Sequence, residues 1–168
     1  MIERHHQQGE TRSSAVYSDC GAYRYALTRD WGAGPRLLYV MLNPSTATEA
    51  ANDPTIERCQ RRAEMLGYGG FRVVNLFALR ATHPADLKAA AAPEGPGNDA
   101  AIRAGAAWAD EILCAWGVHG AHRGRDAAVI QLLRGSDRPV CNLGLTKGGF
   151  PRHPLYISYT CQPKSWNA

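Results

Sequence analysis

Four short apolar runs separated by helix-like segments are the feature that most constrains the fold. The runs, at 37–42, 71–77, 111–116 and 139–143, are rich in the Val, Leu, Tyr and Phe that favour strands. Apolar runs of this length are typical of parallel strands that are buried on both faces. Strands that alternate with helices indicate an α/β sheet covered by helices on its two sides.

The segments between these runs carry boundary signals for helices. Asp53 is a suitable N-cap, Pro54 a suitable first helical residue and Gly67 a suitable stop for a first helix. Two further helices are predicted over about 98–108, with a cap at its first or second residue, and over about 125–134. We therefore expect a three-layer α/β/α fold around a central, mainly parallel four-stranded sheet.

The chain ahead of the first run predicts an antiparallel addition to that sheet. Two short strands, near Val16 and over 23–28, are expected to form an N-terminal edge hairpin. The 168 residues are enough for one domain with a sizeable core, so we expect a single domain over the whole chain. Residues 1–14 and 162–168 are expected to be loosely ordered.

Composition restricts the partners and the compartment. A net charge of +4, from 19 Lys and Arg against 15 Asp and Glu, is compatible with a phosphate-bearing partner. No apolar run approaches the roughly 20 residues of a membrane helix, and the polar start lacks a secretory signal, so we expect a cytoplasmic protein without membrane contact. The five scattered cysteines include no C-x-x-C pair. We interpret them as structural thiols and expect no metal and no cofactor.

Polar residues gather just beyond the predicted strands. In open α/β sheets the ligand lies outside the carboxyl ends of the strands, so functional side chains are expected there. In chain order they are Asn43, Pro44, Ser45 and Thr46, then Asn75, Arg80, Thr82 and His83, then Gly117 to Gly120 with His119, and finally Thr146, Lys147, Arg152, His153 and Tyr156.

The two asparagines have plain interpretations beside functional ones. Asn43 and Pro44 are both favoured in turns and could form one. Asn75 lies inside the apolar VVNLF, where its amide would be buried, and a polar group left unpaired there costs about 1–3 kcal/mol. It either ties two strand ends together or faces a ligand.

The histidines also have plain interpretations beside functional ones. His83 and His119 are typical of surface loops. His153 lies between Pro151 and Pro154, which stiffen the backbone around it. Such rigidity suits a positioned functional group as well as a plain loop.

Several motifs together carry a resemblance to a known family. MLNPSTA, NDPTIERC, GYGGFRVVNLFALRATHPADL, GPGND, CAWGVHG and LGLTKGGFPRHPLYI resemble the bacterial family called domain of unknown function 1643, over residues 22–160. That family name implies no activity.

Four segments also resemble, in the same order, motifs of the uracil-DNA glycosylase superfamily. YVMLNPS is similar to its first motif, VVNLFALR to the strand whose asparagine reads the base, ILCAWGVHG to a strand ending in glycine, and PRHPLY to the late histidine-proline motif. The chain departs from the pattern at Met41, followed by Leu42, where a glycine usually opens the first motif, and at Ser45, where a glycine usually closes it. The cysteines of the iron-sulfur branch have no counterpart, so no cluster is implied.

This second resemblance implies an enzyme that hydrolyses the N-glycosidic bond of a damaged or modified nucleobase in DNA or in a nucleotide. It also implies a role in DNA repair. It implies Asn43 and His153 as catalytic residues, one orienting water and the other stabilising the departing base. The residues implied to bind the base are Asn75, Phe77, Met41 and Leu42.

The same resemblance implies contacts to the rest of a nucleic acid. Ser45, Arg80, Lys147 and Arg152 would bind phosphates, and Leu155 and Tyr156 would form a wedge into the base stack. We expect a monomer that acts on DNA or a nucleotide.

Two other functions stay open at this point. One is a non-catalytic module that binds a nucleobase or nucleic acid with the same fold. The other is a small hydrolase that uses Asp53, His119 and His153, although Asp53 before Pro54 is first of all a helix cap.

Overall fold

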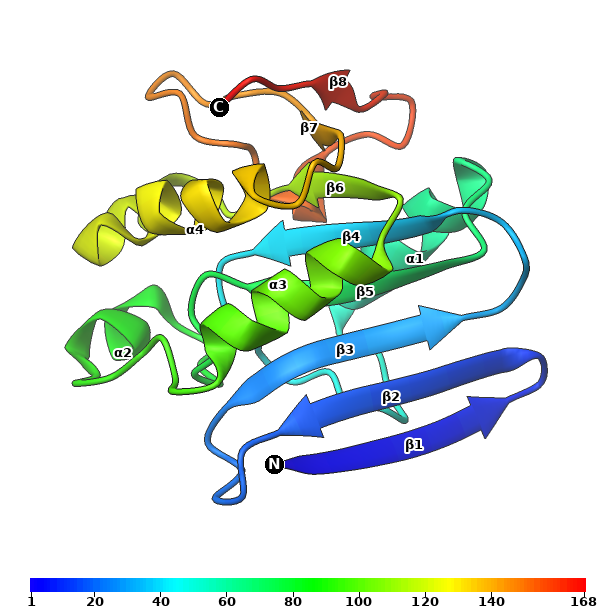
Figure 1. Ribbon diagram of the computed structural model, residues 1–168, viewed down its shortest axis with the longest axis horizontal. Helices are drawn as coiled ribbons and strands as arrows, with labels where there is room; N and C mark the ends of the chain where they lie inside the picture. The colour runs from blue at the N-terminus through cyan, green and yellow to red at the C-terminus, as the bar shows by residue number, and fades with distance from the viewer.

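The computed structural model describes residues 1–168 and contains one mixed sheet of eight strands in the order β1-β2-β3-β5-β4-β6-β7-β8 (Figure 1). The strands are β1 (Ile2–Gln8), β2 (Thr11–Tyr17), β3 (Arg24–Asp30), β4 (Arg36–Met41), β5 (Gly70–Asn75), β6 (Glu111–Cys114), β7 (Val140–Asn142) and β8 (Lys164–Ser165). The helices are α1 (Pro54–Met65), α2 (Pro84–Ala89), α3 (Asn98–Trp108) and α4 (Arg125–Arg134), with the 3₁₀ segments η1 (Val118–Gly124) and η2 (Pro154–Tyr156).

The expected mainly parallel, four-stranded, uracil-DNA glycosylase-like sheet is wrong. The four apolar runs do lie in neighbouring strands, and β5, β4, β6 and β7 pair in parallel. Antiparallel strands extend the sheet on both sides, however, and four of its seven pairings are antiparallel. β2 and β3 are the expected hairpin, but β1 was not expected, because its sequence, IERHHQQ, is exposed at every residue and shows no apolar periodicity.

The ends of the chain also differ from expectation. Residues 2–8, expected to be loosely ordered, form β1 and pair with β2 along their whole length. At the other end, β8 pairs with β7 through Ser165 and Lys164. The predicted hairpin exists as β2 and β3, but it lies inside the sheet rather than at the edge, because β1 covers β2 and β3 pairs with β5. Backbone hydrogen bonds attach β1 and β8 to the sheet, and such bonds do not require a recognisable pattern of side chains.

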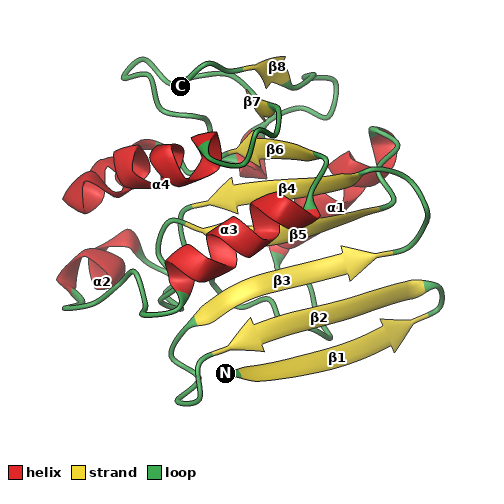
Figure 2. Cartoon of the chain, viewed as in Figure 1, coloured by secondary structure: helices red, strands yellow, loops and turns green.

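Helices cover the central strands on two sides (Figures 1 and 2). α3 and α4 lie in front of the sheet and α1 behind it. Alternate residues of β4 divide between the two faces, since Leu37 and Tyr39 join the core under α1 while Leu38 and Val40 join the core under α3 and α4. Two separate apolar cores therefore fix the central strands, whose carboxyl ends meet at one edge.

Local signals placed three of the helices. α1 begins as predicted, with Pro54 as its first residue and the Asp53 carboxylate accepting a hydrogen bond from the Ile56 N–H at 2.9 Å. α3 and α4 also occupy their predicted ranges. The predicted cap of α3 is wrong, because the N-cap is Gly97 and the side chain of Asn98 is used elsewhere. No helix combines the length and the apolar character needed to span a lipid bilayer.

Candidate functional site

A cavity of about 400 Å³ opens beyond the carboxyl ends of β4, β5 and β6. Three residues far apart in the chain, Asn43, Asn75 and His153, line it together. Met41, Leu42 and Ser45 line it as well. Six of the predicted site residues therefore meet at one place, which the parallel pairing of Met41 with Asn75 and of Val40 with Cys114 explains.

Asn43 is held by its own amide nitrogen. Its Nδ2 donates to the carbonyl oxygens of Ala81, at 2.7 Å, and Pro44, at 3.0 Å. The Ala81 N–H donates back to Pro44 at 3.0 Å, so the loops after β4 and β5 are clasped together. Because only the nitrogen can donate to carbonyls, the orientation of the amide is determined. Its Oδ1 has no partner in the protein and is free to accept a hydrogen bond.

Asn75 is the most unusual polar group of the cavity. The residue is 2% exposed, and neither Nδ2 nor Oδ1 of its side chain has a hydrogen-bond partner. Buried amides are nearly always paired, and each unpaired group costs about 1–3 kcal/mol. The side chain ties no strand ends together, so of the two interpretations of Asn75 the geometry favours the one in which it faces a ligand.

The backbone around Asn75 is, by contrast, fully anchored. Asn98 is completely buried, and its Nδ2 donates to the carbonyl oxygens of Asn75, at 2.9 Å, and Leu76, at 3.0 Å. Arg125 Nε also donates to Leu76 at 2.7 Å and its Nη2 to Asp99 at 2.6 Å. The unpaired amide of Asn75 is thus presented from a rigid strand end.

His153 is neutral and has a defined tautomer. Its Nδ1 accepts a hydrogen bond from the Leu155 N–H at 3.3 Å, so the ring proton of the neutral form is on Nε2. Burial lowers the pKa of His153 below its ordinary 6.5, and the nearby Asp53 carboxylate opposes this only in part. At neutral pH the side chain is therefore a hydrogen-bond donor through Nε2.

The loop after β6 completes this side of the cavity. The N–H of Gly117 donates to the Pro151 carbonyl at 2.8 Å, which joins this loop to the segment that carries His153. Gly117 has a φ of +74°, a backbone conformation that residues other than glycine rarely adopt. Trp116 is 1% exposed, lines the cavity, and has an indole N–H without a partner.

Phe77 does not have its predicted place. It is completely buried, does not line the cavity, and packs against His122 with ring centroids 5.6 Å apart. β5 ends at Asn75, so the alternation of strand side chains no longer applies, and Leu76 and Phe77 both pack into the core under α3 and α4. The aromatic ring available to a ligand is that of Trp116, which we did not predict.

Arg24 is a second unpredicted residue of the cavity. It begins β3, is 2% exposed, and donates from Nη1 to the Ala47 carbonyl at 2.6 Å. Its Nε has no partner, and its Nη2 makes no hydrogen bond. Burial lowers the pKa of Arg24 to about 10, with Asp53 acting in the opposite direction, so the guanidinium keeps its charge.

Asp53 lines the cavity and also caps α1. Its Oδ1 accepts from Ile56 N–H at 2.9 Å and its Oδ2 from Ala47 N–H at 3.2 Å. His119 and His153 line the same cavity, but no hydrogen bond joins any two of these three side chains. A relay of the kind that activates a nucleophile is therefore not assembled among them.

The predicted phosphate contacts do not gather at the cavity, apart from Ser45. Arg80 is exposed, packs over the ring of Tyr17 at 5.4 Å and donates to the Gly21 carbonyl at 3.3 Å. Lys147 and Arg152 are exposed and do not line the cavity either. These three side chains lie on the outer surface of the protein and not in the cavity.

The residues of the predicted wedge follow the cavity-lining His153 closely in the sequence. Leu155 and Tyr156 belong to η2, which begins one residue after His153. Leu155 is half-buried, while Tyr156 is 89% exposed. An aromatic side chain so free of contacts is available to a partner.

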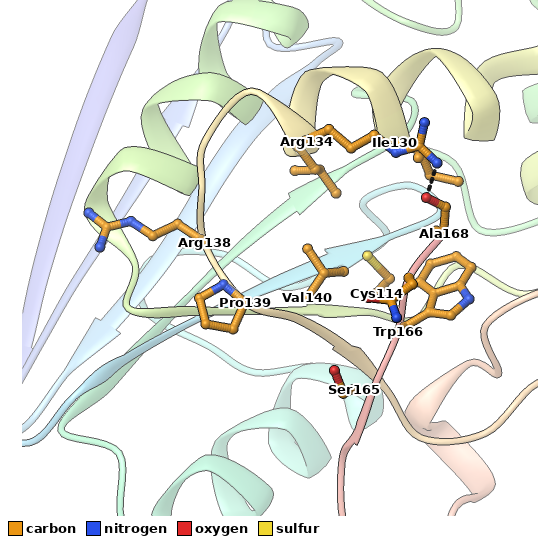
Figure 3. A pocket seen from close by; sticks show the side chains of 11 residues that line it. Cys114, Ile130, Arg134, Arg138, Pro139, Val140, Ser165, Trp166 and Ala168 are labelled. Carbon is orange, nitrogen blue, oxygen red and sulfur yellow. Dashed lines mark hydrogen bonds between the residues drawn. The ribbon is translucent and has the colours of Figure 1, made fainter.

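A larger cavity, of about 540 Å³, lies between α4, β7 and the C-terminal segment (Figure 3). It is lined by Ile130, Val140 and Trp166 among others, and Arg134 bonds the carbonyl of Ala168 across it. Trp166 packs against Trp116 at 5.8 Å, so this tryptophan pair separates the two cavities. The larger one contains none of the predicted residues and no buried polar side chain without a partner. We therefore place the candidate site in the smaller cavity.

Comparisons with known proteins bear on the family only. Residues 24–155 match the family described as "Protein of unknown function (DUF1643)". No curated protein and no solved structure matches the chain. The resemblance to the family of unknown function is thus confirmed, and that to the uracil-DNA glycosylase superfamily stays a prediction.

Proposed function

Since the chain belongs to the family of unknown function DUF1643, whose name assigns no activity, we propose from its cavity that it hydrolyses the N-glycosidic bond of a nucleobase in DNA or a nucleotide. The observation that carries the proposal is the buried, unpaired amide of Asn75, which lines one cavity with the free acceptor of Asn43 and the donor of neutral His153.

Recognition of the base falls to Asn75. A primary amide offers a donor and an acceptor side by side, which is the pattern that the polar edge of a nucleobase complements. Trp116, Met41 and Leu42 supply the apolar surroundings that a flat heterocycle needs. A volume of about 400 Å³ is within the range of small-molecule sites, roughly 300–1,000 Å³.

Cleavage needs a positioned water and a stabilised leaving group. The bond breaks through an oxocarbenium-like sugar, water adds to the anomeric carbon, and the base leaves with negative charge and then takes a proton. Asn43 Oδ1 accepts a hydrogen bond from the water and orients it, although an amide does not remove its proton at neutral pH. His153 Nε2 donates to the atom on which the charge of the base develops.

Several surface features support a polynucleotide as the source of the base. The chain has a net charge of +4, and Arg80, Lys147 and Arg152 expose their cations. Tyr156 is exposed next to the cavity, where it can replace a base drawn out of its stack.

A binding module without catalysis is the second candidate, and one observation favours it. The only carboxylate of the cavity, Asp53, uses both oxygens to accept backbone N–H groups. No carboxylate is therefore free to act as a general base, and the same cavity would hold a nucleobase without releasing it.

Oligonucleotides that carry uracil, hypoxanthine, xanthine or an oxidised pyrimidine, in single- and double-stranded form, test the proposal. The expected result is an alkali-labile site at one of these bases with the wild-type protein and none with Asn43→Ala. His153→Gln should lower the rate by on the order of 10²-fold, as the loss of one donor to a developing anion does elsewhere. Asn167→Ala, which removes an exposed asparagine outside the cavity, is the matched control and should act like wild type.

The two candidates give different results in the same assay. Binding of a modified base that weakens in Asn75→Leu, with no base released by wild type, would establish the binding module and reject the hydrolase. Neither binding nor release with any base would reject both.

A further inference from the structure

We propose that the cavity contains an anion subsite built on Arg24, so that its ligand is a nucleobase joined through its sugar to a phosphate rather than a free base or nucleoside. This inference rests on the proposed function and assigns the residues that bind the phosphate of its substrate. It uses residues that the recognition of the base does not use.

The first argument is the state of the Arg24 guanidinium. It is buried to 2% exposure and lines the cavity, yet it makes a single hydrogen bond, from Nη1 to Ala47. Nε is sealed from solvent without a partner, and no acidic side chain lies within salt-bridge distance of it. A buried cation costs several kcal/mol unless it is paired, so a site with open donors is suited to an anion that arrives with the ligand.

The second argument is the start of α1, a helix of twelve residues. Thr55, its second residue, lines the cavity, and the N–H of Thr55 has no acceptor in the protein. The neighbouring Ile56 N–H is taken by Asp53, and Pro54 has none to offer. The free N–H groups and dipole at a helix N-terminus favour an anion. Arg24 and Thr55 thus present donors from two different elements to one space.

Arg24 shares this end of the cavity with one carboxylate, and two further arginines lie near it. Asp53 is the one acidic group that lines the cavity, and its oxygens already accept from Ala47 and Ile56. Arg29 and Arg80 lie close enough to act on Arg24 as like charges. His153 is neutral at pH 7 and adds no charge of either sign.

Phosphate is the anion that fits this set of donors. A guanidinium donates in a fixed fork that matches two oxygens of a phosphate, and backbone N–H groups at a helix end complete such sites. The phosphate could come from a free nucleotide or from the backbone of a strand. Both present the same group next to the sugar, and binding experiments separate them.

The test compares nucleosides with their 5′- and 3′-monophosphates, short single-stranded oligonucleotides and inorganic phosphate, by calorimetric titration at constant ionic strength. Wild type should bind one monophosphate or an oligonucleotide at least about tenfold more tightly than the matching nucleoside, which corresponds to about 1.4 kcal/mol. Arg24→Met should remove that advantage and leave nucleoside binding unchanged. Arg103→Met, at an exposed arginine of α3 outside the cavity, should keep it.

Arg24→Lys keeps the charge without the fork and covers the case in which Arg24→Met does not fold. It should keep part of the advantage, with a loss of about threefold or more. The Arg24-dependent advantage should appear with monophosphates if the substrate is a nucleotide, and only with oligonucleotides if it is a strand.

The failure of this inference differs from failure of the proposed function. Equal binding of nucleoside, monophosphate and oligonucleotide by wild type, or an advantage that survives in both Arg24 variants, would reject the anion subsite and leave the base site intact. Binding of inorganic phosphate that depends on Arg24, with no affinity for any nucleoside, would support the subsite and reject the recognition of a base.

Discussion

Two regions of the protein bury an arginine, and they treat it differently. Where α1 meets the segment after η2, Arg62 is 1% exposed and donates to the carbonyls of Ile157, at 2.9 Å, and of Ser158 and Cys161, both at 3.2 Å. At the cavity, Arg24 is as deeply buried and has one acceptor. Nε is without a partner in both, so the difference lies in the terminal nitrogens: those of Arg62 hold three carbonyls, whereas Nη2 of Arg24 makes no hydrogen bond.

Asn75, the last residue of β5, and Asn98, the first residue of α3, repeat this contrast. Asn98 uses its amide nitrogen on two backbone carbonyls, and Asn75 uses neither end of its amide. Both are almost completely buried, so exposure does not distinguish them. Oδ1 lacks a partner in both, so they differ at the amide nitrogen, which holds two backbone carbonyls in Asn98 and makes no bond in Asn75.

The largest effect is expected when the arginines are compared. Arg62→Met leaves three carbonyls without their donor and should lower the free energy of unfolding by about 3–5 kcal/mol. Arg24→Met removes a poorly paired buried charge and should cost less than about 1.5 kcal/mol. Urea denaturation measures both. Equal losses would show that Arg24 is as structural as Arg62 and would end the contrast.

Next in size is the comparison of the asparagines. Asn98→Ala should destabilise by about 2 kcal/mol, because the carbonyl of Asn75 loses its side-chain donor. Asn75→Leu replaces an unpaired amide by an apolar group of similar size and should change stability by less than about 1 kcal/mol, or raise it. The same Asn75 variant should lose ligand binding. A large loss of stability in Asn75→Leu would mean that its amide has a structural partner.

The pH dependence of His153 should be smaller. The folded-state pKa of His153 is lowered, so the unfolded chain takes up the proton more readily. The stability contributed by the neutral ring is complete above pH 6.5 and is lost as the pH falls through that value towards the folded pKa. Wild type should therefore lose more stability than His153→Gln between pH 7 and 5, as measured by thermal unfolding. Parallel curves would contradict the neutral tautomer.

Tyr156→Ala should have the smallest effect on the fold. The side chain is 89% exposed, so the melting temperature should not change measurably. If Tyr156 enters the base stack, activity on duplex should fall more than activity on a single strand. The ratio of the two rates measures this. An unchanged ratio would remove Tyr156 from the role of wedge.

Much of the site was predicted from sequence, and the omissions have a common cause. Asn43, Asn75 and His153 follow strands or prolines that local pattern identifies, and parallel neighbours bring such residues to one edge. Arg24 begins a strand whose place beside β5 depends on pairing across the chain, so nothing in its neighbours reveals its burial. Phe77 packs into the core instead of the cavity because β5 ends at Asn75, and sequence does not tell on which side a ring beyond a strand end will lie.

The amino-acid sequence alone determined the central strands, the starts of the main helices and the polar residues that follow the strands, because apolar periodicity and helix capping act over a few residues. Tertiary structure alone decided the mixed eight-stranded sheet, with β1 and β8 at its edges, since backbone ladders form without a side-chain signature. It also decided which buried polar groups lack partners. The number of hydrogen bonds that each group makes depends on atoms contributed by distant segments. It separates Arg24, with one bond, and Asn75, with none, from Arg62, with three, and Asn98, with two.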